Sequence, residues 1–134
     1  MLEVFLVHPG GPYWARKDDG VWSIPKGEYQ QDEEPLRAAQ REFLEETGVA
    51  LPGPFLVLPP VTQPSGKIIS AWASEGDLDP DQLRSNSFSL EWPPKSGQMQ
   101  DFPEVDRGAW FSLEHALVKL SPGQRPLLRA VAKL

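Results

Sequence analysis

Residues 27–49 read GEYQQDEEPLRAAQREFLEETGV, and this stretch decides the fold. It predicts a helix from Glu34 to Thr47, because Pro35 occupies the first helical position and Gly48 follows the last turn. Three apolar residues recur on one face of this helix: Leu36, Ala39 and Phe43. That face is expected to contact the core, which leaves the opposite face to polar side chains.

The polar face of the predicted helix carries three glutamates, Glu42, Glu45 and Glu46, within an arc of about 100° at helical spacing. Carboxylates this close repel one another and destabilise a helix. A hard divalent cation would relieve the repulsion, and oxygen ligands favour Mg²⁺ or Mn²⁺ over Zn²⁺. Arg41 lies four residues before Glu45 and can orient its carboxylate. The alternative is a solvated acidic face without a ligand, which is the usual role of an isolated glutamate-rich helix.

The residues around these glutamates form a wider pattern. Its fixed positions are Gly27, Glu33, Arg41, Glu42, Glu45, Glu46 and Gly48, with apolar residues at 43 and 49. At ordinary amino-acid usage, seven fixed residues arise by chance at roughly one in 10⁸ or less. The pattern resembles the Nudix box of the Nudix hydrolase superfamily at every defining position, and the box covers residues 27–49.

The resemblance implies a fold and a reaction. The implied fold is a single α/β domain over residues 1–134, an α/β/α sandwich with a mixed sheet. The implied reaction is hydrolysis of a nucleoside diphosphate linked to another moiety, with Mg²⁺ or Mn²⁺ as the cofactor. Bound divalent ions neutralise charge on phosphates and activate water, which is what this reaction needs.

The resemblance also implies roles for individual residues. Three carboxylates would act as catalytic metal ligands: Glu42, Glu45 and Glu46. Arg41 and Glu33 would support them by fixing the loop and the carboxylates. Gly27 would let the backbone turn close to the metal and the phosphates. The identity of the general base varies within the superfamily, so this role is not assigned to one glutamate.

Two segments outside the box resemble parts of particular Nudix branches. Residues 22–27, WSIPKG, are similar to the approach to the box in dinucleoside-polyphosphate hydrolases and some MutT-like relatives, where the lysine, here Lys26, reaches a phosphate. Residues 102–111, FPEVDRGAWF, are similar to a late segment of the diadenosine-polyphosphate and RNA-pyrophosphohydrolase branches, which implies that Glu104 reaches the metal site as a ligand or base. Lys95 is a third candidate for a phosphate contact. The competing interpretation of each is an exposed surface charge.

The other elements are predicted from periodicity and turn residues. Strands are expected at residues 2–7, 55–58, 67–73, 88–92 and 108–111. Helical segments are expected at residues 77–84, 113–120 with Ser112 as the N-cap, and in the last residues around Leu127, Leu128 and Val131. Residues 93–101 are expected to be a loop, and Trp14 and Trp22 are expected to anchor the irregular segment 13–26 in the core.

Composition restricts the partners. The chain has 134 residues and a formal net charge of −6, from 13 basic and 19 acidic side chains. This balance disfavours nonspecific binding to duplex nucleic acid or to a membrane surface. There are no cysteines, so disulfides and thiolate metal sites are excluded, and a reducing cytoplasm is the expected location. No apolar run approaches the ~18 residues of a membrane-spanning helix, and the start lacks the basic region of a signal peptide.

The beginning of the chain departs from the resembled pattern. Nudix domains of this type usually have a strand ahead of the one predicted at residues 2–7, whereas here Met1 directly precedes that strand. Either the domain lacks its first strand, or the natural start lies upstream. Both explanations predict an exposed sheet edge, which would allow pairing with a second copy as a homodimer.

Three functions remain open on the sequence. The first choice is hydrolysis of a small-molecule nucleotide substrate, a dinucleoside polyphosphate. The second is a MutT-like pyrophosphohydrolase of nucleoside triphosphates, and the third is a sensor that binds nucleotides without turnover. Five aromatic residues can stack on a base, although aromatic residues at such spacings are more often in the core: Tyr13, Trp14, Trp72, Phe88 and Trp92.

Overall fold

The computed structural model describes residues 2–27 and 32–134, so Met1 and residues 28–31 of the box lie outside the described residues. The strands are β1 (Glu3–Pro9), β2 (Leu56–Thr62), β3 (Ile68–Ala73), β4 (Ser87–Glu91), β5 (Met99–Pro103) and β6 (Val105–Ser112). The helices are α1 (Pro35–Thr47), α2 (Leu113–Lys119) and α3 (Arg125–Ala132), with short 3₁₀ turns η1 (Pro80–Gln82) and η2 (Pro122–Gln124). The mixture of helices and strands confirms the α/β class.

The described strands pair two by two, and each pair is antiparallel: β1 with β6, β2 with β3, and β4 with β5. The parallel part of the expected mixed sheet is limited, among the described residues, to a bridge between Trp22 and Leu120. Val7 exchanges two backbone hydrogen bonds of 2.9 Å with Ser23. These bonds partly cover the edge of β1 that the sequence predicted to be exposed.

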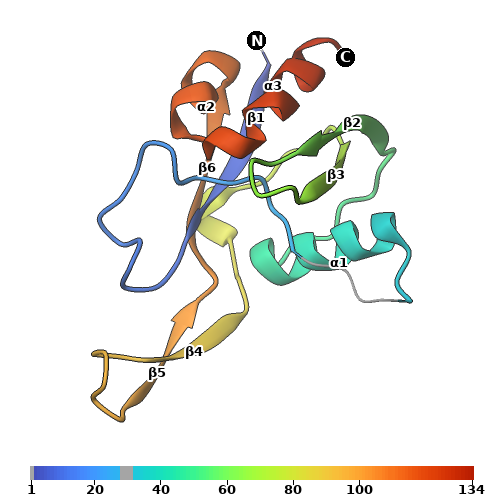
Figure 1. Ribbon diagram of the computed structural model, residues 1–134. Coiled ribbons are helices and arrows are strands. Elements are labelled where there is room, and N and C mark those ends of the chain that lie inside the picture. The colour runs from blue at the N-terminus through green and yellow to red at the C-terminus, as the bar shows by residue number, and fades with distance from the viewer. Residues whose placement is uncertain (1, 28–31) are drawn as a thin grey trace.

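The helices cover the strand pairs from different sides. Helix α2 packs against β1 and β6, and α3 packs against α2 and β2, so these two helices lie together at the top of Figure 1. Helix α1 contacts β3, so the β2–β3 pair lies between α3 and α1. The β4–β5 hairpin extends away from the helices at the bottom of the same view. Within the described part of the chain, no helix has both the length and the apolar character needed to cross a lipid bilayer.

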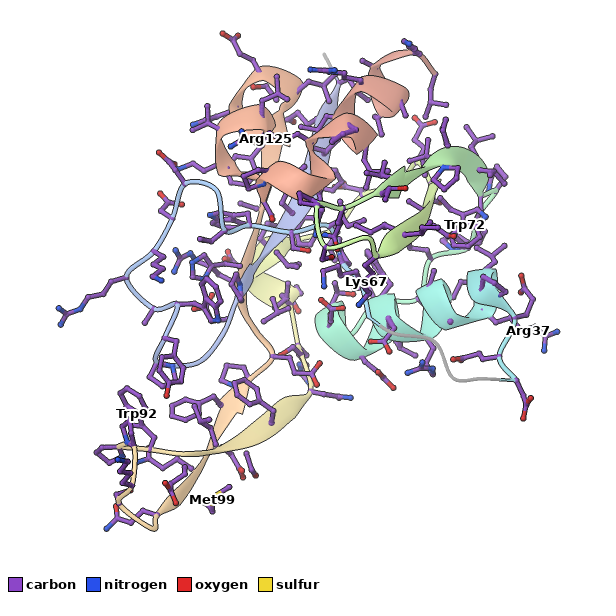
Figure 2. All side chains as sticks on the ribbon, in the orientation of Figure 1. Arg37, Lys67, Trp72, Trp92, Met99 and Arg125 are labelled. Carbon is purple, nitrogen blue, oxygen red and sulfur yellow. The ribbon has the colours of Figure 1, made fainter. Side chains whose placement is uncertain are left out.

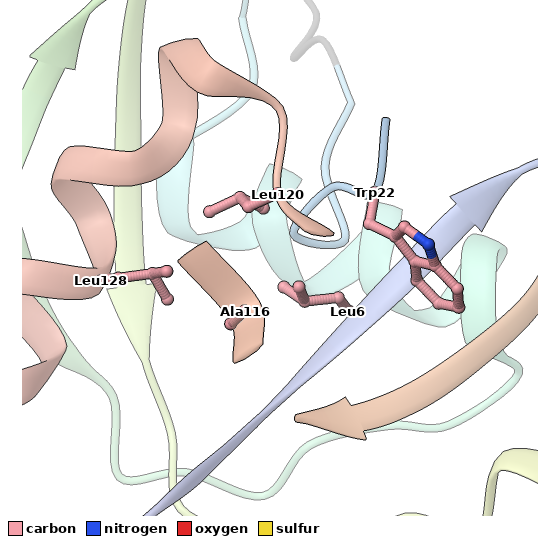
Figure 3. Close-up of a cluster of buried hydrophobic side chains, with 5 residues drawn as sticks. All are labelled: Leu6, Trp22, Ala116, Leu120 and Leu128. Carbon is pink, nitrogen blue, oxygen red and sulfur yellow. The ribbon is translucent and has the colours of Figure 1, made fainter. Parts of the chain in front are cut away.

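The main core lies where β1 meets α2 and α3. Its buried side chains converge in Figure 3 from four parts of the chain: Leu6, Trp22, Ala116, Leu120 and Leu128. A second buried cluster joins Leu127 of α3 to the β2–β3 pair. Burial of such apolar side chains contributes about 25 cal/mol per Å² removed from water, so these contacts fix α3 against both strand pairs.

Helix α1 has the ends that the sequence predicted. The Glu34 carboxylate caps it by accepting hydrogen bonds from the backbone N–H groups of residues 36 and 37, and Pro35 follows at the first position. Gly48 ends the helix with a φ of 78°, in the left-handed region that favours glycine. Because these signals are local in sequence, they predict the helix within one residue.

Burial along α1 differs from the prediction. The apolar residues Leu36, Ala39 and Phe43 are half-buried, whereas the buried positions are Ala38, Glu46 and Thr47. The physical reason is that residues 84–86 cover the last turn, where the Arg84 and Asn86 N–H groups donate to the carbonyl oxygens of Thr47 and Glu45. A polar carboxylate is therefore buried at the end of a helix whose apolar face is only half covered.

Two other expectations were wrong. Residues 99–101 belong to strand β5 instead of a loop, because the turn before them, with Lys95 and Gly97 at positive φ, returns the chain along β4. Trp22 is buried as expected, with 4% exposure, but Trp14 is 41% exposed and does not anchor the core.

Candidate active site

Glu46 is the buried carboxylate of the site. It lies near the end of α1, is 7% exposed, and accepts a 2.9 Å hydrogen bond from the backbone N–H of Lys26. That bond ties the WSIPKG segment, which leads into the box at Gly27, to the last turns of the helix. Lys26 and Glu46 are twenty residues apart in the sequence, and the two segments meet at the Glu46 carboxylate.

Glu104 reaches the same place through a series of backbone hydrogen bonds. The Asn86 N–H donates to the carbonyl oxygen of Glu45 at 2.8 Å, and the Glu104 N–H donates to the carbonyl oxygen of Asn86 at 2.8 Å. The Gly10 N–H then donates to the carbonyl oxygen of Glu104 at 2.9 Å. The end of α1, the start of β6 and the loop after β1 are thereby joined. The sequence did not single out Asn86. This residue contributes through its backbone N–H and carbonyl groups, which nearly every residue type has, so no sequence motif marks it.

The carboxylates lie within electrostatic reach of one another. Burial raises the pKa of Glu46 to about 8, and the charges of Glu42 and Glu104 add to the rise while the bond from Lys26 opposes it. Burial also raises the pKa of Glu42, where Arg41 opposes the rise and the charges of Glu45 and Glu104 add to it. We call Glu42, Glu45, Glu46 and Glu104 the acidic cluster. Burial is the larger cause of the raised pKa of both Glu42 and Glu46, and the neighbouring carboxylates add to it.

Arg41 holds the outer part of the cluster. Its Nε and Nη2 donate to the two carboxylate oxygens of Glu33 at 2.8 and 2.9 Å. Its Nη1 lies 2.9 Å from Glu42 Oε1 and 3.1 Å from Glu45 Oε2. The hydrogen bonds to Glu33 are the largest cause of a raised pKa for Arg41, so the guanidinium stays charged. One rigid fork thus positions three glutamates.

Gly27 lies directly against Glu42. A Cβ atom placed on Gly27 would collide with the carboxyl group and Cγ of Glu42. Any side chain at position 27 would therefore displace that carboxylate or the backbone beside it. The sequence predicted that the backbone at Gly27 would lie close to a metal and phosphates. In the structure, the contact described for this backbone is with the Glu42 carboxylate.

The cluster borders a cleft of about 350 Å³. Two members of the cluster, Glu46 and Glu104, line it together with Lys26, and its lining also includes Pro9, Trp14 and Val105. Lys26 is exposed. The structure thus brings together a cation, carboxylates and an aromatic ring in one concave surface, and this combination is typical of sites for small charged ligands.

Lys95 is not brought to this cleft. It lies in the turn between β4 and β5, where its backbone N–H donates to Glu91 Oε1 at 2.8 Å. That hairpin extends away from α1 in Figure 1. The predicted phosphate contact of Lys95 therefore has no support from its position.

The donor set fits a hard divalent cation by its chemistry. No three acidic or histidine side chains among residues 2–27 and 32–134 are gathered as a ready ligand set. Arg41 instead pairs with Glu42 and Glu45, and Glu46 accepts from Lys26. All four side chains of the cluster nevertheless offer carboxylate oxygens, which are the ligands of hard cations. Burial, with a smaller contribution from neighbouring carboxylates, raises the pKa of Glu42 and Glu46, and a bound cation would favour their charged forms.

The raised pKa of Glu46 predicts how stability depends on pH without metal. Between the ordinary value of 4.5 and about 8, the folded protein keeps the Glu46 proton that the unfolded chain has released. Unfolding then releases a proton, so the free energy of unfolding falls as the pH rises through this window. The measurement is calorimetry in EDTA at pH 5 and pH 8. The fall in Tm between these two pH values should be about 3–10 °C larger for the native protein than for Glu46→Gln. Equal slopes in the two proteins would contradict the assignment.

Comparisons with known proteins bear on nearly the whole chain. The sequence model of the NUDIX domain matches residues 3–131. The solution structure of the E. coli ORF135 protein is similar, with 28% sequence identity, a TM-score of 0.58, and coverage of 98% of this chain and 81% of that chain. No curated protein of similar sequence was found. NUDIX enzymes hydrolyse pyrophosphate bonds and generally use divalent metals such as Mg²⁺ or Mn²⁺. This chain belongs to the NUDIX family.

Proposed function

We propose that this protein is a hydrolase that depends on Mg²⁺ or Mn²⁺ and cleaves a phosphoanhydride bond of a dinucleoside polyphosphate. The observation that carries the proposal is the acidic cluster beside Lys26. Glu46 is buried there at a cost that the folded protein alone does not offset, as its pKa of about 8 indicates. Burial of a carboxylate among other carboxylates is expected at functional sites, because a structural role is served as well by a neutral side chain.

The acidic cluster supplies the ligands in this proposal: Glu42, Glu45, Glu46 and Glu104. When bound, a divalent ion would offset the charge of the substrate phosphates and lower the pKa of a coordinated water. Arg41 keeps Glu42 and Glu45 in place through its ion pairs. Since its other donors are fixed on Glu33, the guanidinium acts as a positioning group.

Lys26 and Gly27 bind the substrate in this proposal. Lys26 lines the cleft, and its ammonium offers positive charge to a phosphate in a protein whose net charge is −6. Gly27 keeps the backbone open beside Glu42. Proton transfer from the attacking water needs a carboxylate close to the reacting phosphate, and both Glu46 and Glu104 border the cleft.

The substrate choice depends on the two segments outside the box. Lys26 and Glu104 border the same cleft, and these are the residues through which the chain resembles dinucleoside-polyphosphate hydrolases. The nucleoside triphosphate alternative uses the same cluster and the same lysine. The two substrates differ in what lies beyond the phosphates, so only turnover distinguishes them.

A substrate panel tests the proposal. The protein would be incubated with Mg²⁺ or Mn²⁺ and with diadenosine polyphosphates, canonical and oxidised nucleoside triphosphates, ADP-ribose and nucleotide sugars, and the products separated by chromatography. We expect the highest kcat/KM with a diadenosine polyphosphate and loss of turnover in EDTA. A preference for one nucleoside triphosphate would select the MutT-like alternative. Nucleotide binding with no turnover of any compound would reject the enzyme in favour of a sensor.

A further inference from the structure

Trp14 is a large aromatic side chain that stays exposed at the wall of the cleft. Its exposure is 41%, against 4% for Trp22 only eight residues later. It lines the same cleft as Lys26, Glu46 and Glu104. Burying an exposed aromatic ring against a ligand is favourable, so a ring at this place stabilises a bound ligand with an apolar face.

The backbone around Trp14 is held in place by the core. The Lys17 N–H donates to the carbonyl oxygen of Trp14 at 2.9 Å. The carbonyl oxygen of Lys17 lies 2.6 Å from Nε2 of His8, which is fully buried and whose Nδ1 lies 2.9 Å from Asp106. The Lys17 ammonium lies over the indole of Trp14, 5.0 Å from the ring centre. The ring is therefore preorganised, which lowers the entropy lost when a ligand packs on it.

The other candidate aromatic residues have different neighbours. Tyr13 packs edge-on against Trp92, 5.2 Å between ring centres, and Phe88 packs against Phe102 on the β4–β5 hairpin. In Figure 2, Trp92 lies on that hairpin and Trp72 lies above α1 on the opposite side of the molecule. Among these five candidates, all in the described part of the chain, only Trp14 lines the cleft that contains Lys26 and Glu46.

We infer that Trp14 stacks on a nucleobase of the substrate while the phosphates lie beside Lys26. This inference rests on the proposed function, because it takes the ligand to be a nucleotide. Every base has an aromatic face, so stacking selects nucleotides over sugar phosphates without choosing among bases. Trp14 is thus a specificity-determining residue for a nucleotide, and the cluster performs the same chemistry without it.

The test compares binding of AMP with binding of ribose 5-phosphate, which lacks the base. Calorimetric titrations would use the native protein, Trp14→Ala, Trp14→Phe and Tyr13→Ala. Tyr13 is the matched control, since it lies on the same loop with 55% exposure but packs against Trp92. We expect Trp14→Ala to weaken AMP binding about 5- to 100-fold, with Trp14→Phe restoring much of it. The affinity of Trp14→Ala for ribose 5-phosphate should stay within about 2-fold of the native value. The affinity of Tyr13→Ala for AMP should also stay within about 2-fold of the native value.

The outcomes separate this inference from the proposed function. Equal AMP affinity in Trp14→Ala and Tyr13→Ala, or no preference of the native protein for AMP over ribose 5-phosphate, would overturn the role of Trp14. Loss of ribose 5-phosphate binding in Trp14→Ala would also overturn it, because the ring would then act on the phosphate end. These titrations need no turnover. An inactive protein that shows the expected AMP losses would therefore reject the hydrolase and keep the stacking site.

Discussion

Glu46→Gln lowers Mg²⁺-dependent turnover by about 10²–10⁴-fold, the range expected when a group that holds the metal or moves a proton is lost. The substitution changes one oxygen to an amide nitrogen, and the remaining oxygen can still accept the bond from the Lys26 N–H. Removal of a carboxylate whose pKa is about 8 also removes a charge that burial disfavours. The variant should therefore be inactive and at least as stable as the native protein at pH 8 without metal.

The measurement is kcat and KM on the best substrate of the panel, together with Tm in EDTA. Glu75→Gln is the control, because Glu75 is an exposed glutamate beyond the end of β3. It makes the same chemical change outside the cluster and should keep native turnover within about 2-fold. If Glu46→Gln retains native turnover, the buried carboxylate has a structural role and the proposed ligand set is wrong.

Gly27→Ala has the second large effect. The new methyl group would overlap the Glu42 carboxyl, so either that carboxylate or the backbone after Lys26 must move. A displacement of about 1 Å at a reacting centre costs about 10²-fold in rate. We expect kcat to fall at least about 100-fold, while circular dichroism and Tm show that the fold is kept.

Gly76→Ala is the matched control for this substitution. A Cβ on Gly76 would meet a side-chain atom of Leu51 at 3.9 Å, which is ordinary contact, and Gly76 has no positive φ. Both variants add the same methyl group and lose the same backbone freedom. A similar fall in kcat for the two would mean that lost flexibility, and not the position of Glu42, explains the effect.

Local signals in the sequence predict most of the elements. The helix α1 follows from Glu34, Pro35 and Gly48, and Ser112 begins α2 by accepting a hydrogen bond from the His115 N–H, as the sequence predicted. Strand β5 was missed, because Met99, Gln100 and Asp101 are exposed and lack the alternation of a half-buried strand. The turn before them sets their pairing with β4. That turn depends on the positive φ angles of Lys95 and Gly97, which the periodicity of the sequence does not reveal.

The candidate site could be predicted only in part. Spacing on one helix brings Glu42, Glu45 and Glu46 together, because helical geometry alone places them on one face. The position of Glu104 was implied by resemblance, since no local rule says that a strand start lies beside the end of α1. The exposure of Trp14 could not be predicted, because tryptophan favours burial and the cleft wall forms only when distant segments meet.

The pairing of β1 with β6 also has a consequence for synthesis of the protein. Glu3 pairs with Ser112 and Val7 with Gly108, so the first strand leaves the ribosome roughly a hundred residues before its partner. At about 5–20 residues per second, β1 waits for about 5–20 s, during which a chaperone can bind it. Glu104 and Val105 emerge in the same late interval. The nascent chain therefore gains Glu104 and its closing strand together, so the cleft beside Glu46 is completed only after these late residues have emerged.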